Sequence, residues 1–186
     1  MKKLVFTMIA IMSIGLMSAQ TKVGGVNLPD TETYQEQTLN LNGAGVREKL
    51  WIDLYAGGLY LSKKSSNASE IVSANEAMSI KLHIVSKLIT SDKMIDAVNE
   101  GFENSTSGNT KPLASKIEKF RSFFSAEIKK NDVFDIVYIP ETGVTAYKND
   151  KELGTIEGMD FKKALFGIWL SNRPADDDLK EAMLGK

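Results

Sequence analysis

A run of strand-forming residues at positions 50–62 is the feature that most constrains the fold of this chain. It reads Leu-Trp-Ile-Asp-Leu-Tyr-Ala-Gly-Gly-Leu-Tyr-Leu-Ser, and aromatic and aliphatic residues of this kind favour β-structure. The segment before it, 42–49, reads Asn-Gly-Ala-Gly-Val-Arg-Glu-Lys, and its glycines predict a turn that allows close backbone approach. Arg47 is therefore expected to be fixed by a sheet.

Strands and helices alternate in blocks along the rest of the chain. Two short strands are predicted between Thr21 and Leu41, the second over 37–41, and further strands over 78–86, 132–139, 144–148 and 152–156. The polar side of strand 78–86 should face solvent or a ligand cavity. Helical spacing of apolar residues predicts a short helix or turn over 65–73, helices beginning near Ser91 and Thr110, and helices over 159–170 and 175–185. This order predicts an α+β fold with a mostly antiparallel sheet.

The first 19 residues have the three parts of a secretory signal peptide. Lys2 and Lys3 precede an apolar run over 4–17, and Met17-Ser18-Ala19 provides a small-residue cleavage site. A membrane anchor is the alternative, but the apolar run is shorter than the roughly 20 residues that span a bilayer. We therefore expect a signal peptide over 1–19, one domain over 20–186, and a monomeric protein that is periplasmic or secreted.

Composition excludes several classes of function. The chain has no cysteine, which rules out disulfides, thiol catalysis and cysteine-bound metals. Without the two lysines of the expected signal peptide, 21 basic residues face 24 acidic ones, and no basic patch suggests nucleic-acid binding. His83 is the only histidine and cannot by itself form a typical zinc site. The acids at 176–178 suit the first turn of a helix better than a metal site, so no metal or cofactor is expected.

Several blocks of sequence resemble the chalcone isomerase-like superfamily. The first is Gly43-Ala44-Gly45-Val46-Arg47, followed by the Gly-Leu-Tyr-Leu of 58–61; others lie at 143–144, 154–161 and 168–180. The resemblance covers nearly all of the expected mature chain and is greatest to a bacterial, exported branch. It implies an antiparallel sheet with a layer of helices on one face and a ligand cleft between the two layers.

Arg47 is the strongest candidate for a functional residue. Its guanidinium carries a permanent charge and can hold a carboxylate, enolate or phenolate through two parallel hydrogen bonds. From residue types alone, a strand-end arginine paired with a neighbouring acid is the more common case, because exposed arginines are frequent. The resemblance instead implies that Arg47 lies in the cleft. There it would stabilise an oxyanion, as in chalcone isomerases, or hold a ligand carboxylate, as in the fatty-acid-binding members.

The other positions implied by the resemblance depart from the enzymes. Tyr55 takes the place of a catalytic threonine, Thr90 and Ala97 align with the active-site tyrosine and asparagine, and Ile168 and Trp169 align with a threonine-methionine pair. Tyr55 follows Arg47 by eight residues, on the same face of a continuous strand. Because eight strand residues span about 26 Å, the two side chains meet at one small ligand only if the chain turns between them.

These observations favour a non-catalytic binder of a small anionic or amphipathic ligand such as a fatty acid. The expected ligand-binding residues are Arg47, Tyr55, Thr90 and Trp169. The alternative is an isomerase or intramolecular lyase of the chalcone-flavanone type acting on an enone-like substrate, with Arg47 as the retained catalytic residue. A third interpretation is a structural domain in which Arg47 forms a buried salt bridge.

Overall fold

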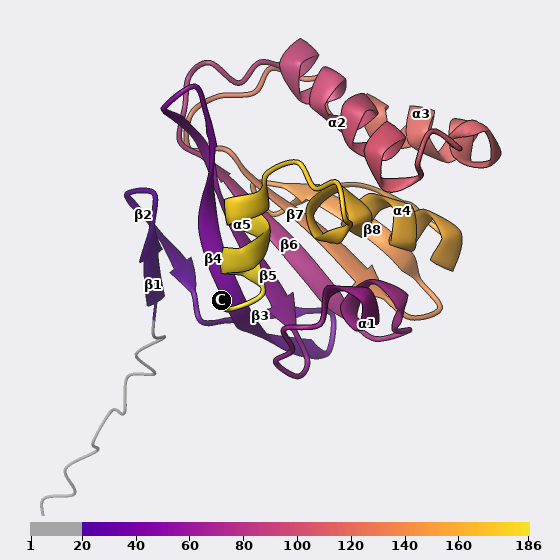
Figure 1. Ribbon diagram of the computed structural model, residues 1–186, viewed down its shortest axis with the longest axis horizontal. Helices are drawn as coiled ribbons and strands as arrows, with labels where there is room; N and C mark the ends of the chain where they lie inside the picture. The colour runs from indigo at the N-terminus through magenta and orange to yellow at the C-terminus, as the bar shows by residue number, and fades with distance from the viewer. Residues whose placement is uncertain (1–19) are drawn as a thin grey trace, which may run out of the picture.

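The computed structural model describes residues 20–186, and the signal peptide expected over 1–19 lies outside the described residues (Figure 1). The strands are β1 (Gln20–Val23), β2 (Val26–Pro29), β3 (Thr31–Tyr34), β4 (Gln37–Lys49), β5 (Ile52–Leu61), β6 (Met78–Ile84), β7 (Val133–Ile139), β8 (Gly143–Lys148) and β9 (Lys151–Ile156). The helices are α1 (Ala68–Ser73), α2 (Ser91–Ser105), the 3-10 turn η1 (Lys111–Leu113), α3 (Ala114–Ser122), α4 (Met159–Leu170) and α5 (Asp177–Met183).

Strands β3 to β9 form one sheet in which every strand pairs antiparallel with the next strand in the sequence. β1 and β2 form a separate hairpin against the outer face of this sheet, where Leu28 lies over Gly58 and Gly24 lies near Val46. The helices cover the opposite face (Figure 1). The predicted α+β class, with an antiparallel sheet and a helix layer on one face, is confirmed.

The core lies between the sheet and the helices. Strand residues such as Leu59 and Ile80 pack there with Phe102, Phe120 and Phe161 from three helices. The sequence predicts one buried stripe on α4, but this helix is buried on nearly every side from residue 161 to 170, because it lies under the other helices as well as over the sheet.

The glycines before Arg47 do not form the predicted turn. They lie within β4, a strand of 13 residues. A Cβ atom at Gly43 would lie 2.1 Å from the carbonyl oxygen of Ala182, and one at Gly45 would lie 2.7 Å from the Cβ of Ala182. The two glycines therefore allow α5 to pack directly on the strand backbone, so the close approach is made by a helix of this chain.

The turn lies inside the run that the sequence assigned to one strand. Leu50 and Trp51 have φ values of 53° and 61°, and Lys49 pairs with Ile52 around them. A two-residue loop with two positive φ angles is a type I′ hairpin turn. β4 and β5 are therefore neighbouring antiparallel strands, and Arg47 and Tyr55 are direct partners across them.

Two further expectations differ from the structure. The region 21–41 contains three short strands and the start of β4 instead of two strands, because the chain reverses at Gly24-Gly25 and again at Gln35. Most of the polar side of β6 is buried, and only His83 stays partly exposed to solvent. Lys81 is buried there and forms ion pairs of 2.7 Å with Asp135 and 2.9 Å with Glu32.

Candidate functional site

Arg47 lies near the end of β4, beside an irregularity in the sheet. Arg47 pairs with Tyr55, but the next pair is Glu48 with Asp53, so Leu54 is an extra residue on β5. The carbonyl of Leu54 accepts hydrogen bonds from the backbone N–H groups of residues 85 and 86, at 3.1 and 3.2 Å. This bulge bends the hairpin and fastens the β6–α2 loop beside Arg47.

A pocket of about 360 Å³ opens at this point, between the β4–β5 hairpin, the β6–α2 loop and α2. Its apolar wall includes Leu54, Ile89, Met94 and Ala97. Its charged residues are Arg47, Lys49, Lys93, Asp96 and Glu100. Three cations and two carboxylates thus surround a largely apolar space, which is an arrangement suited to an amphipathic ligand.

Tyr55 forms the inner boundary of the pocket next to Arg47. Its ring centroid lies 5.8 Å from the Arg47 guanidinium carbon, and its hydroxyl accepts a hydrogen bond of 3.0 Å from Nε1 of Trp169. Burial raises the pKa of Tyr55, against the opposing effects of the Arg47 charge and the Trp169 hydrogen bond. Tyr55 is therefore a neutral phenol near pH 7, and its O–H group donates to no acceptor among the described residues.

Arg47 has no acidic partner within residues 20–186, since none of the ion pairs formed there includes it. The interpretation of Arg47 as a surface or buried salt-bridge residue therefore finds no support in the described part of the chain. A half-buried guanidinium beside an apolar pocket is instead available to an anionic ligand.

Of the other residues singled out by the sequence, some lie at the pocket and some do not. Trp169 lies behind Tyr55 and reaches the site through the hydrogen bond to its hydroxyl. Thr90 caps α2, with its side chain accepting from the backbone N–H of Lys93 at 3.4 Å, and it is not among the residues that line the pocket. Ala97 lines the pocket, whereas Ile168 packs against Gly101 in the core. The structure thus brings Arg47, Tyr55 and Trp169 together and leaves Thr90 outside.

Sequence reasoning missed the pocket residues of the β6–α2 loop and of the first turns of α2. Leu88 and Ile89 follow the end of β6 with no motif, and Lys93 looks like any solvated helix residue. Met94 was recognised only as part of an apolar helix face. Its helical spacing predicts burial but cannot distinguish the core from a pocket wall.

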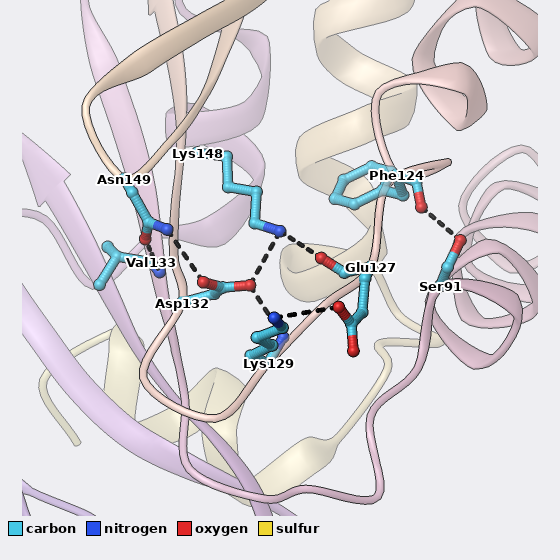
Figure 2. A network of polar contacts seen from close by, with 8 residues as sticks. All are labelled: Ser91, Phe124, Glu127, Lys129, Asp132, Val133, Lys148 and Asn149. Carbon is cyan, nitrogen blue, oxygen red and sulfur yellow. Dashed lines mark hydrogen bonds and ion pairs between the residues drawn. The ribbon is translucent and has the colours of Figure 1, made fainter.

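A polar network fixes the beginning of α2, and Figure 2 shows its residues. The hydroxyl of Ser91, the first residue of α2, donates to the carbonyl of Phe124. The loop after Phe124 is tied to the sheet through Asp132, which accepts from Lys148 at 2.8 Å and from Asn149 at 2.9 Å. Burial works to raise the pKa of Asp132, but these hydrogen bonds outweigh it and the pKa is lowered. The α2 wall of the pocket is thereby held against the sheet.

Comparison with known proteins identifies the family of this chain and a solved structure with a similar fold. A family model described as chalcone isomerase-like matches residues 20–185. The chain belongs to the chalcone isomerase-like family. Among solved structures, the fold is similar to that of a fatty-acid binding protein from Arabidopsis thaliana, with a TM-score of 0.68 and 17% sequence identity over 86% of this chain and 92% of the other. At that identity the likeness shows the fold alone. No curated protein matches the sequence.

Residues 20–186 contain neither a metal-binding cluster of side chains nor a membrane-spanning helix. No group of histidine and acidic side chains in this part of the chain is arranged to hold a metal ion. His83 is half-buried, and burial together with the nearby charge of Lys81 lowers its pKa. None of the helices in this range is long and apolar enough to cross a membrane.

Proposed function

We propose that the protein binds a small anionic amphiphile such as a fatty acid, with the head group at Arg47 and the chain in the adjoining pocket. The observation that carries this proposal is a guanidinium with no acidic partner in the described chain, placed at a pocket with an apolar wall. A similar fold in a protein described as fatty-acid binding gives the proposal further support.

The chemistry of the pocket favours a head group with one negative charge. Arg47 can donate two parallel hydrogen bonds to a carboxylate, and the O–H group of Tyr55 is available as a further donor. Asp96 and Glu100 offset two of the three positive charges around the pocket, which leaves a net charge of +1 (three cations minus two carboxylates). A dianion would reverse the net charge of the occupied pocket to −1, whereas a monocarboxylate brings it to zero.

Titration with dodecanoate, followed by calorimetry, tests the role of Arg47. Arg47→Met removes the charge and keeps an unbranched side chain, and we expect about a 10- to 100-fold loss of affinity because charged hydrogen bonds are lost. Dodecanol, which lacks the charge, should bind both proteins with similar weak affinity. Arg173→Met is the matched control, because Arg173 is exposed and does not line the pocket. Equal dodecanoate affinity in wild type and Arg47→Met would refute the proposal.

Two expectations from the sequence stay predictions. The isomerase alternative requires conversion of a chalcone to a flavanone that Arg47→Met abolishes. We propose export to the periplasm or the medium from the pattern of the first 19 residues. Fractionation of a producing bacterial cell tests this, and a protein that stays in the cytoplasm with its first 19 residues intact would contradict it.

A further inference from the structure

The large apolar side chains that remain exposed in residues 20–186 all gather at one place. They are Leu50, Trp51, Ile52 and Leu88, with exposed fractions of 76%, 90%, 41% and 48%. Leu50, Ile52 and Leu88 also line the pocket beside Arg47, and Trp51 lies at the tip of the same hairpin. We call these four residues the apolar rim. Exposed apolar side chains that cluster in this way mark an interaction site, whereas scattered ones need no explanation.

The hairpin turn does not require these residues. A type I′ turn has two positive φ angles, and Asn-Gly is the pair that adopts it most readily. Leu50 and Trp51 adopt positive φ, a conformation that bulky side chains disfavour. The fold would therefore be served better by other residues at 50 and 51. Two bulky apolar side chains at a strained turn indicate that they serve an interaction rather than the fold.

We propose that the apolar rim docks on the surface of a lipid bilayer, where a fatty acid can pass between the membrane and the pocket. The ligand named here rests on the proposed function, whereas the docking does not. Figure 1 shows the tip of the β4–β5 hairpin extending beyond the sheet beside the loop between β6 and α2, so the tip and this loop, which carries Leu88, can meet a flat surface together. Tryptophan at the tip suits the interface between lipid chains and water, because its ring is apolar and its N–H group can remain hydrated.

A second copy of the chain is the less suitable occupant. Stable protein interfaces bury about 800 Å² on each partner, and four side chains at one end of a hairpin supply only part of that area. The charges around the apolar rim are mixed. Lys49, Lys87 and Lys93 lie near Glu48, Asp53, Asp96 and Glu100 in the sequence or along the pocket wall. Docking should therefore depend on apolar insertion and should need no anionic lipid.

Co-sedimentation with phosphatidylcholine vesicles tests the proposal. The proteins compared begin at Gln20, the first residue that the family model covers, so that the apolar segment before it cannot itself insert. Leu50→Asn combined with Trp51→Gly removes the tip and installs the preferred turn pair, so this variant should melt at a higher temperature than wild type. We expect its partition coefficient onto vesicles to be at least roughly tenfold lower than that of wild type. Wild type should partition equally with and without added phosphatidylglycerol.

Trp51 provides a second measurement. The chain has two tryptophans, and Trp169 is only 6% exposed, so changes of emission on adding vesicles should come from Trp51. Its emission should shift to shorter wavelength, and acrylamide should quench it less. Unchanged emission, or equal sedimentation of wild type and the tip variant, would overturn the proposal. Lipid-free dimers that the tip variant abolishes would overturn it in favour of a second copy. Docking without dodecanoate affinity would count against the proposed function alone.

Discussion

Lys162 allows a prediction in which the sign and size of a pH effect follow from the structure. This α4 residue is fully buried, and its Nζ donates to the carbonyls of Ile71, Val72 and Ala74 at 2.8–2.9 Å. It therefore caps the end of α1, and none of the ion pairs within residues 20–186 includes it. Burial lowers the pKa of Lys162 from 10.5 to about 8, and the neighbouring charge of Lys163 acts in the same direction.

Stability should rise with pH above 8. Between the folded value of about 8 and the unfolded value of 10.5, the unfolded chain keeps the proton of Lys162 and the folded protein does not. The state that binds more protons is favoured by low pH, so raising the pH favours the folded state. For these two pKa values the free energy of unfolding should increase by about 2 kcal/mol from pH 7 to 9.5.

Urea denaturation at pH 7 and 9.5, at one ionic strength, measures this increase. The pKa values of all five tyrosines are raised in the folded protein, so at the upper end of the window tyrosine loses its proton only in the unfolded chain, which opposes the increase slightly. Wild type and the Lys162 variant share this effect, so the difference between them isolates Lys162. Lys162→Met should abolish the increase, and Lys163→Met, on the exposed side of α4, should keep it. If wild type and Lys162→Met have the same flat or falling stability over this range, the reasoning is wrong.

Two other predictions concern how the site is held. Gly45→Ala should destabilise the fold by about 1–2 kcal/mol, because the added Cβ would crowd Ala182. In a double-mutant cycle, combining it with Ala182→Gly should show a favourable coupling. Additive effects of the two substitutions would contradict the packing argument. Asp132→Asn should cost about 1–2 kcal/mol at pH 7. Because the pKa of Asp132 is lowered, its contribution to stability is present above pH 4 and is lost as the pH falls. The difference in urea midpoint between wild type and Asp132→Asn should therefore shrink towards pH 3. A difference that stays constant would exclude this cause.

The sequence was a good guide to the elements and a poor guide to where one strand ends. Period-2 and period-3.6 patterns found β6 to β9, α2 and α4 because each pattern reports which side of an element is buried. The turn at Leu50-Trp51 escaped because leucine and tryptophan favour strands and nothing local marks the reversal. Only the pairing of β4 with β5, a contact between segments, decides that the run is two strands.

The sequence predicted a site residue when its own residue type and motif indicated its role, and failed when the role depends on neighbours in space. Arg47 was found because a permanent charge follows a distinctive glycine block. The alternation of polar residues on β6 suggested solvent or a ligand, but the same alternation serves a buried ion pair, and Lys81 with Asp135 forms one. Thr90 illustrates the opposite difficulty, because a threonine before a helix caps it whether or not a pocket is near.

The position of the pocket follows from the same glycines that first drew attention to Arg47. On the inner face of β4 and β5, Gly45 pairs with Gly57, and Leu179 of α5 lies directly over both. The next inward pair is Arg47 with Tyr55, whose large side chains leave no room for a helix at that distance. α5 therefore covers the part of the sheet that contains the glycines, and the space beyond it is bounded by the side chains of Arg47 and Tyr55 and by α2. The packing of α5 on the sheet therefore accounts for the position of Arg47 at the pocket, without reference to a ligand.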